Sequence, residues 1–208
     1  MFKHSRLLFV VIGATVTLGA LVGTASANRL STTSRNIRAT WAQLVSEGAF
    51  EQNLSCPVTL EGSLHSNVIT KSAGALIGFI SRSTVNAGAC SGAAMTVLQA
   101  SLPWHIRYAS FTGTLPAITK VNVQVIGMSF RLLSGAGASC LFVTSTTQPA
   151  TLGFNRAAGG ALTSADFGGS ITSTTGCLFG FRTTATLTGR STTLTQLGLA
   201  TGITVTLI

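Results

Sequence analysis

The run Cys56-Pro57-Val58-Thr59-Leu60-Glu61-Gly62-Ser63-Leu64-His65 alternates between two kinds of side chain. Apolar or small residues occupy every second position from Cys56 to Leu64, and polar residues or proline lie between them. Because successive side chains of a strand point to opposite faces, this period of two predicts a β-strand with one buried face.

The same period returns further along the chain. Val121, Val123 and Val125 alternate with polar residues, and the pattern repeats from Ile203 to Leu207. Glycine-containing turn sequences separate the alternating runs; they lie at 86–88, 91–92, 112–113, 134–135, 159–160 and 168–169. Short strands between such corners predict an all-β fold, either an antiparallel β-sandwich or a barrel.

Two segments fit this pattern less well. Residues Ser72–Ser83 are compatible with a short buried helix or a strand, and the strand is favoured. The opening segment alternates from Ile37 to Trp41, but Leu44 and Val45 break the alternation.

The sequence Thr-Leu-x-Gly occurs at 59–62 and again at 186–189. This single repetition is compatible with two halves of similar construction, which would divide near residues 134–139. Residues 28–208 are otherwise expected to form one all-β domain, since their length suits a single hydrophobic core.

The first 27 residues have the order of a secretory signal peptide. Lys3 and Arg6 precede an uncharged, mainly apolar run at 7–24, which is expected to be helical, and the small residues 25–27 follow. Cleavage is expected before Asn28, so the protein is predicted to be secreted or held at the cell surface. The alternative is a retained membrane anchor, because the run reaches the lower end of a bilayer span, about 17–25 residues.

Charged residues are scarce, at 8% of the chain compared with roughly 25% in an ordinary globular protein. Removing 27 of the 208 residues leaves 181, with 11 basic and 4 acidic side chains and a net charge of +7. This balance favours an anionic partner, such as a wall polymer, a glycan or a membrane surface. The basic residues form no stripe that could follow a phosphate backbone, so nucleic acid is not an expected partner.

Four cysteines follow the leader, at Cys56, Cys90, Cys140 and Cys177. An even number in an exported protein predicts two disulfides, which allow three connectivities. The pairs Cys56–Cys90 and Cys140–Cys177 are favoured because each closes a short loop. A zinc site made of four thiolates would need the close Cys-x-x-Cys spacing that this sequence lacks.

Glu61, Ser63 and His65 have the residue types of a hydrolase triad. Side chains at alternate positions of a strand stand about 6–7 Å apart, whereas a triad needs hydrogen-bonded contacts near 3 Å. A secreted hydrolase that uses His65 or His105 is therefore kept only as an alternative function. The two histidines lack further zinc ligands, and no phosphate-binding loop is present, so no metal or cofactor is expected.

Trp104, His105, Arg107 and Tyr108 are the strongest candidates for a binding strip, because aromatic and cationic side chains concentrate there. Alternation would place Trp104 and Tyr108 on one face of a strand and His105 and Arg107 on the other. The competing interpretation is a central strand that packs its aromatic side chains into the core.

Five segments carry a resemblance to other proteins: Cys56-Pro57-Val58-Thr59-Leu60-Glu61-Gly62-Ser63, Leu76-Ile77-Gly78, Leu102-Pro103-Trp104-His105-Ile106-Arg107-Tyr108, Thr112-Gly113-Thr114-Leu115-Pro116 and Ile203-Thr204-Val205-Thr206-Leu207-Ile208. Together they look like a group of uncharacterised exported proteins from soil actinobacteria. The resemblance covers most of the chain after the leader. It implies export and an all-β fold, and it implies no activity, ligand or catalytic residue.

These observations predict an exported all-β protein that acts by binding or as a structural component. Self-assembly through sheet edges is a further alternative, because few charges are present to block edge pairing.

Overall fold

The computed structural model describes residues 29–49, 53–92, 94–133, 137–174, 177 and 183–208. The predicted leader and its cleavage site before Asn28 lie outside the described residues. β-Strands dominate the rest, with only the short 3-10 helices η1 (Ala87–Ala89) and η2 (Gln99–Ser101) between them, which confirms the all-β prediction. Among the described residues, no helix is long and apolar enough to cross a bilayer.

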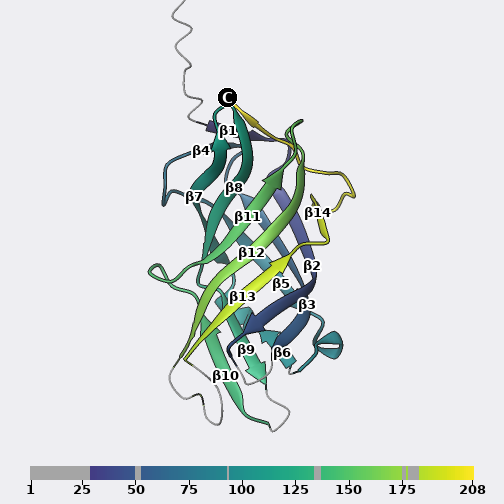
Figure 1. Cartoon of the computed structure of the whole chain (residues 1–208), viewed down its shortest axis with the longest axis vertical. Helices are drawn as coiled ribbons and strands as arrows, with labels where there is room; N and C mark the ends of the chain where they lie inside the picture. The colour runs from purple at the N-terminus through teal and green to yellow at the C-terminus, as the bar shows by residue number, and fades with distance from the viewer. Residues whose placement is uncertain (1–28, 50–52, 93, 134–136, 175–176, 178–182) are drawn as a thin grey trace, which may run out of the picture.

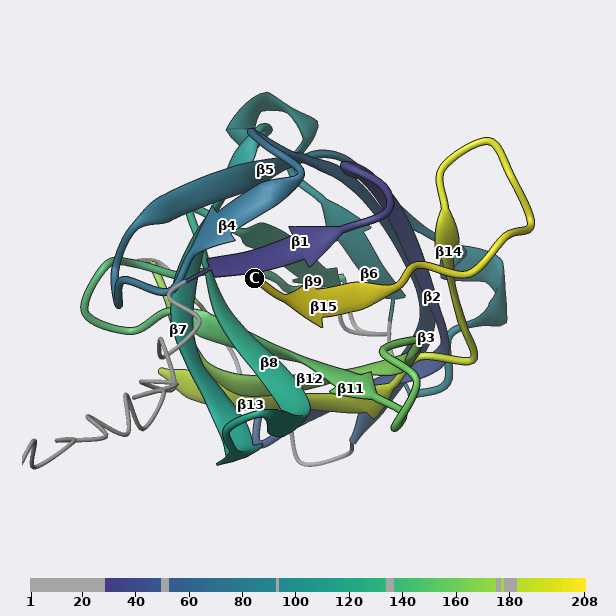
Figure 2. The same cartoon turned by 90° about the horizontal axis from the view of Figure 1, so that it is seen from above.

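Eight antiparallel strands close into a barrel (Figures 1 and 2). They are β2 (Asn36–Glu47), β3 (Leu54–Leu64), β5 (Leu76–Val85), β7 (Trp104–Thr114), β8 (Ala117–Ile126), β11 (Ala150–Arg156), β12 (Leu162–Ser173) and β13 (Thr184–Arg190). Each pairs with the next in this order, and β13 closes the ring by pairing with β2. Of the two expected architectures, the structure is therefore the barrel.

The remaining strands lie at the barrel's two ends or on its outside. The strands β1 (Arg29–Thr32), β4 (Val68–Thr70) and β15 (Val205–Leu207) form a separate sheet in the order β15-β1-β4 across one opening (Figure 2). We call this sheet the lid, the end that it covers the lid end, and the opposite end the far end. At the far end, β6 (Ala94–Val97), β9 (Ser129–Leu133) and β10 (Ser139–Val143) continue the main sheet beyond β12. The short strand β14 (Thr193–Gln196) pairs with residues 37–40 of β2, on the edge of β2 that pairs with β13 further along.

Both disulfides lie at the far end. Cys56 in β3 bonds to Cys90 just after η1, and Cys140 in β10 bonds to Cys177 beyond the end of β12. The predicted pairing is confirmed, and no described cysteine is free.

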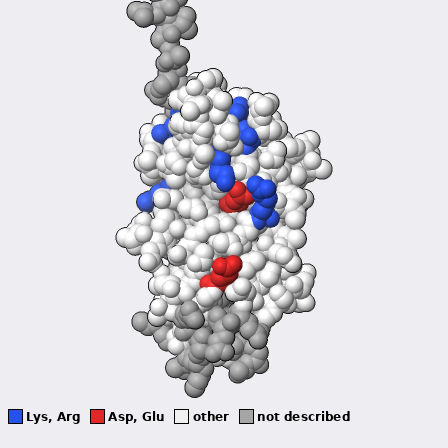
Figure 3. All heavy atoms as spheres, in the orientation of Figure 1, with Lys and Arg blue, Asp and Glu red and all other residues white. Residues whose placement is uncertain are grey.

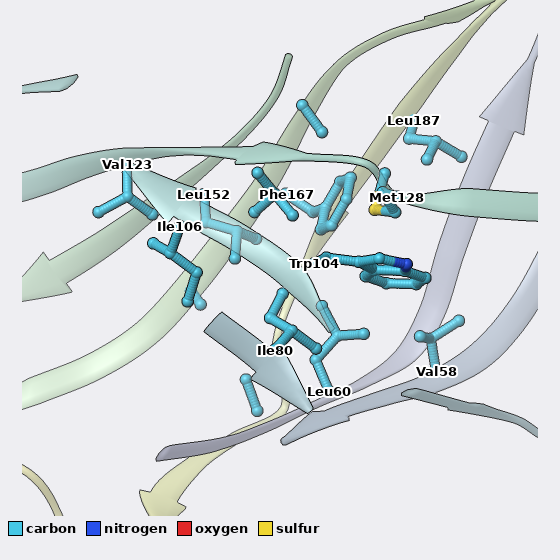
Figure 4. Close-up of a cluster of buried hydrophobic side chains, with 14 of the residues drawn as sticks. Val58, Leu60, Ile80, Trp104, Ile106, Val123, Met128, Leu152, Phe167 and Leu187 are labelled. Atoms are coloured by element: carbon cyan, nitrogen blue, oxygen red, sulfur yellow. The ribbon is translucent and has the colours of Figure 1, made fainter. Parts of the chain in front are cut away.

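The barrel interior is filled with apolar side chains that converge from the surrounding strands (Figure 4). The indole of Trp41 donates to the carbonyl oxygen of Ala165 at 3.1 Å and meets Phe167 edge to face. Nearer the far end, Trp104 packs against Phe130. Burial of these side chains supplies the main stabilisation of the fold, at roughly 1.5–3 kcal/mol for a fully buried large apolar side chain.

The two ambiguous segments are both strands. Residues Leu76–Val85 form β5. In β2 the register shifts between Trp41 and Leu44, and both side chains are fully buried. The break in alternation at this point is therefore a β-bulge, which restores the inward direction of the side chains after an irregular pairing.

Strands from both halves of the sequence belong to one ring, in which they follow one another in chain order. Leu133 of β9 pairs with Ser139 of β10, so the sheet continues across the expected subdivision near 134–139. Residues 134–136 themselves lie outside the described residues.

Candidate functional site

The four residues of the predicted binding strip lie on two sides of the barrel wall. Trp104 and Tyr108 are buried inside, whereas His105 is exposed and Arg107 half-buried on the outside. Burial raises the pKa of the Tyr108 phenol. The structure does not bring these side chains together on one surface.

Glu61, Ser63 and His65 project outward from β3 and the residue after it, but each has a different neighbour. Glu61 accepts from Arg38 at 2.8 Å, and the Ser63 hydroxyl donates to Asn36 at 3.0 Å. The His65 ring lies 6.0 Å from the ring of Phe79. The three side chains are therefore not arranged as a triad.

In the described part of the chain, no hydrogen bond joins His65 or His105 to a hydroxyl or a carboxylate. No group of three or more metal-ligating side chains gathers among the described residues either.

A second carboxylate, Asp166, lies on the outer wall between two cations. Lys120 approaches its carboxylate to 2.6 Å and Arg190 to 3.0 Å. Partial burial would raise the pKa of Asp166, but hydrogen bonds from Lys120, Asn155 and Arg190 outweigh it and lower this pKa from 3.8 to about 2. Glu61 has the same arrangement between Arg38 of β2 and Arg82 of β5, the two strands beside β3. Asp166 links β12 to its neighbour β13 and, across β11, to β8.

The space beneath the lid is the candidate site. An apolar cavity of about 40 Å³ separates the lid from the barrel. The lid supplies Leu30, Ile69 and Val205 to its lining, and the barrel supplies Ile77, Val121 and Phe154 among others. The lining contains no ionisable side chain.

A second apolar cavity of about 30 Å³ continues deeper into the barrel. It shares Ile37, Leu64, Ile106 and Phe154 with the upper cavity and reaches down to Trp41. Together these two cavities form what we call the chamber.

The few hydroxyl groups near the chamber donate hydrogen bonds to other protein groups. Thr32 donates to the carbonyl oxygen of Ser34 at 2.9 Å, and Ser63 donates to Asn36. An apolar cavity without polar partners does not hold ordered water, so the chamber suits a hydrocarbon group.

A surface groove of about 170 Å³ lies beside the lid, between β4 and the start of β5. Ile69 and Ile77 line both this groove and the upper cavity, so these two side chains form the wall between them. The groove is partly polar, with His65, Ser66 and Thr70 among its lining residues.

The lid is attached unequally on its two sides. On the β15 side, Val205 N–H donates to Gly160 at 2.8 Å, Leu162 N–H donates to Ile203 at 2.7 Å, and Arg156 Nε donates to Val205 at 2.7 Å. On the other side, β4 pairs with no described strand except β1. The groove therefore lies along the less tightly held edge of the lid.

The sequence reasoning missed β1, β4 and the chamber. The alternation predicts the strand at Ile203–Leu207, but it does not predict that this strand covers one opening of a barrel. Leu30 and Ile69 lie in strands too short to show a period of two, which explains why no pattern pointed to the lid.

No known protein family, curated protein or solved structure matches this chain.

Proposed function

We propose that this chain is an exported binding protein that takes an unbranched apolar chain into its chamber. The observation that carries the proposal is the adjacency of three spaces. The surface groove, the upper cavity and the lower cavity lie in series, and neighbouring spaces share lining residues.

The shape of the space favours a narrow ligand. Eight-stranded barrels are wide enough either to be filled by side chains or to hold one small ligand. Here the upper barrel retains two small voids in series, of about 40 and 30 Å³. An unbranched chain can enter such spaces by displacing a few side chains and the free edge of the lid, whereas a fused ring system would need the wall to rebuild. Each methylene group buried would contribute about 0.8 kcal/mol.

The groove favours a polar head group on this chain. His65, Ser66 and Thr70 offer hydrogen-bonding groups at the outer end of the path. Lys71 follows Thr70 directly, and its ammonium group lies 5.3 Å from the centre of the Phe111 ring. A fatty acid carboxylate would suit this position, with its hydrocarbon chain in the chamber.

An extracellular location supports this role. The two disulfides are compatible with an oxidising compartment, and the first 27 residues have the order of a signal peptide. Outside the cell, a protein with a dry chamber could carry a ligand that water dissolves poorly.

The test uses the two tryptophans as separate reporters. Trp41 lines the lower cavity, and Trp104 does not line the chamber. The probe is dodecanoic acid with bromine on its terminal carbon, because bromine quenches tryptophan fluorescence at short range. We expect the probe to quench the Trp104→Phe variant, which retains Trp41, and to leave the Trp41→Phe variant nearly unquenched.

The wall between the groove and the upper cavity is tested by Ile69→Ala and Ile77→Ala. Each variant should raise the association rate of the probe several-fold in stopped-flow measurements. Ile171→Ala is the matched control, because Ile171 is also a buried isoleucine but lines neither the groove nor the chamber. Absence of Trp41 quenching at saturating probe would overturn the proposal, as would equal acceleration by the control.

A further inference from the structure

Among the described residues, the large apolar side chains that remain exposed gather toward one end of the molecule. Within the described residues they are Val68, Leu76, Leu115, Leu199 and Ile208, at 36–56% exposure. Single exposed apolar residues are ordinary on protein surfaces. Their restriction to the lid and the loops around it is not explained by the packing of the fold.

Each of these residues has a fixed place at or beside the lid. Val68 belongs to β4, and Leu76 begins β5 beside the groove. Leu115 lies in the turn between β7 and β8. Ile208 follows β15 and exchanges backbone hydrogen bonds with Arg29 of the lid.

Leu199 lies in the loop that leads from β14 back to the lid. Figures 1 and 2 show this loop projecting to the side of the lid end.

Cations without a carboxylate partner lie at the same end. Arg29 begins β1, Arg35 connects the lid to β2, and Lys71 follows β4. Within the described residues, no carboxylate forms an ion pair with any of the three.

The described acidic side chains lie elsewhere. Glu61 and Asp166 are each held between two cations on the wall, and Glu47 ends β2 toward the far end. On the face drawn in Figure 3, red atoms lie at mid-height and below, whereas blue atoms extend toward the lid end.

The chain also enters the fold at this end. The apolar run at 7–24 is separated from Arg29 by residues 25–28 alone. Four extended residues span at most about 14 Å. A leader inserted in a membrane would therefore hold the lid end close to the bilayer during export.

We propose that the lid end docks on the surface of an anionic lipid bilayer. Leu115, Val68 and Leu76 would enter the boundary between head groups and acyl chains, and Arg29, Arg35 and Lys71 would contact lipid phosphates. A soluble polyanion would use the cations but would leave the apolar side chains in water. This inference does not depend on the chamber holding a ligand, although docking would place the groove against a source of acyl chains.

The experiment measures sedimentation of the protein with vesicles, using the chain from Asn28 onward, which contains every described strand. We expect binding to vesicles of phosphatidylcholine mixed with phosphatidylglycerol, weaker binding to phosphatidylcholine alone, and weakening at high salt. Arg35→Glu and Lys71→Glu should each lower the partition coefficient at least about five-fold, the effect of one surface cation. Leu115→Ser should weaken binding at every salt concentration.

Arg131→Glu is the matched control, because Arg131 is an exposed cation in β9 at the far end. An equal effect of this control would overturn the proposal, since the attraction would then be that of overall charge. Equal binding to the two kinds of vesicle would also overturn it, as would complete competition by soluble polyglutamate with no effect of Leu115→Ser.

The variants Arg35→Glu and Leu115→Ser separate this proposal from the proposed function. Arg35 and Leu115 line neither the groove nor the chamber. If docking fails, quenching of Trp41 by the brominated acid is unaffected, and if ligand binding fails, the vesicle measurements still decide whether the lid end docks.

Discussion

The two ends of the barrel are held together by different forces. At the far end, two disulfides cross-link β3 and β10 to neighbouring segments, and Trp104, Phe130 and Phe142 are completely buried. At the lid end, backbone hydrogen bonds and the side chain of Arg156 attach a three-stranded sheet above two apolar voids.

This difference means that the far end should resist local opening, whereas the lid end should open more easily. A covalent cross-link restricts local opening, whereas a sheet held at one side by hydrogen bonds opens at a free energy well below that of global unfolding. The far end therefore acts as a fixed base, and the lid end is the part of the barrel suited to movement.

The largest expected effect comes from removing a cross-link. A double variant Cys56→Ala with Cys90→Ala should lose roughly 3–4 kcal/mol of unfolding free energy, because the disulfide closes a loop of 34 residues in the unfolded chain. Urea unfolding followed by circular dichroism measures the change.

The same double variant should leave the association rate of the brominated acid unchanged in the folded protein. A change in that rate comparable to the effect of Ile69→Ala would break the comparison, because the far end would then control access to the chamber.

A smaller effect is expected at the lid. Arg156 donates to Val205 of β15 and to Ile118 of β8, so Arg156→Met removes two hydrogen bonds from a charged donor. We expect a loss of about 2 kcal/mol, with faster hydrogen exchange at the amides of β1 and β15. Mass spectrometry of peptides from both ends provides the measurement.

Exchange in β9 and β10 serves as the internal control for this variant. Uniform acceleration across the protein would show that the lid does not open separately from the rest of the barrel.

The smallest effect is expected on the wall between the ends. The pKa of Asp166 is about 2 in the folded protein, below its ordinary value of 3.8. Ionised Asp166 therefore stabilises the fold above about pH 4, and this contribution is lost as the pH falls toward 2.

Asp166→Asn should cost less than about 1 kcal/mol at neutral pH, because the ion pairs are partly exposed and screened by solvent. Thermal unfolding of both proteins from pH 7 to pH 2 should show the difference shrinking to zero. A constant difference across this range would contradict the assigned role of the charge.

The strands were predictable because their signal is local. Each inward side chain from Cys56 to Leu64 follows the period of two, and even the disturbance after Trp41 marked a real bulge. Gly62 entered that series only as a small residue. The structure shows why glycine is needed at this position: β3 and β5 approach closely, and a Cβ on residue 62 would lie 2.6 Å from the carbonyl oxygen of Phe79.

The candidate site was not predictable in the same way. The concentration of aromatic and cationic residues at 104–108 pointed to a surface strip, but the barrel wall separates Trp104 and Tyr108 from His105 and Arg107. The chamber has no motif, because ordinary Ile, Leu and Val residues line it, and its identity depends on which of them face each other.

Strand periodicity can be read along the chain, because it depends on residues close in sequence, and the expectation of an export signal rests on the same kind of local pattern. Closure of the barrel and formation of the lid depend on pairings such as β13 with β2 and Leu30 with Leu207. These pairings join segments that are far apart in the sequence, and no local sequence pattern in either segment identifies its partner. Only the folded chain therefore determines that β1, β4 and β15 form a cover over an apolar space, and that the exposed apolar side chains among the described residues collect around that cover.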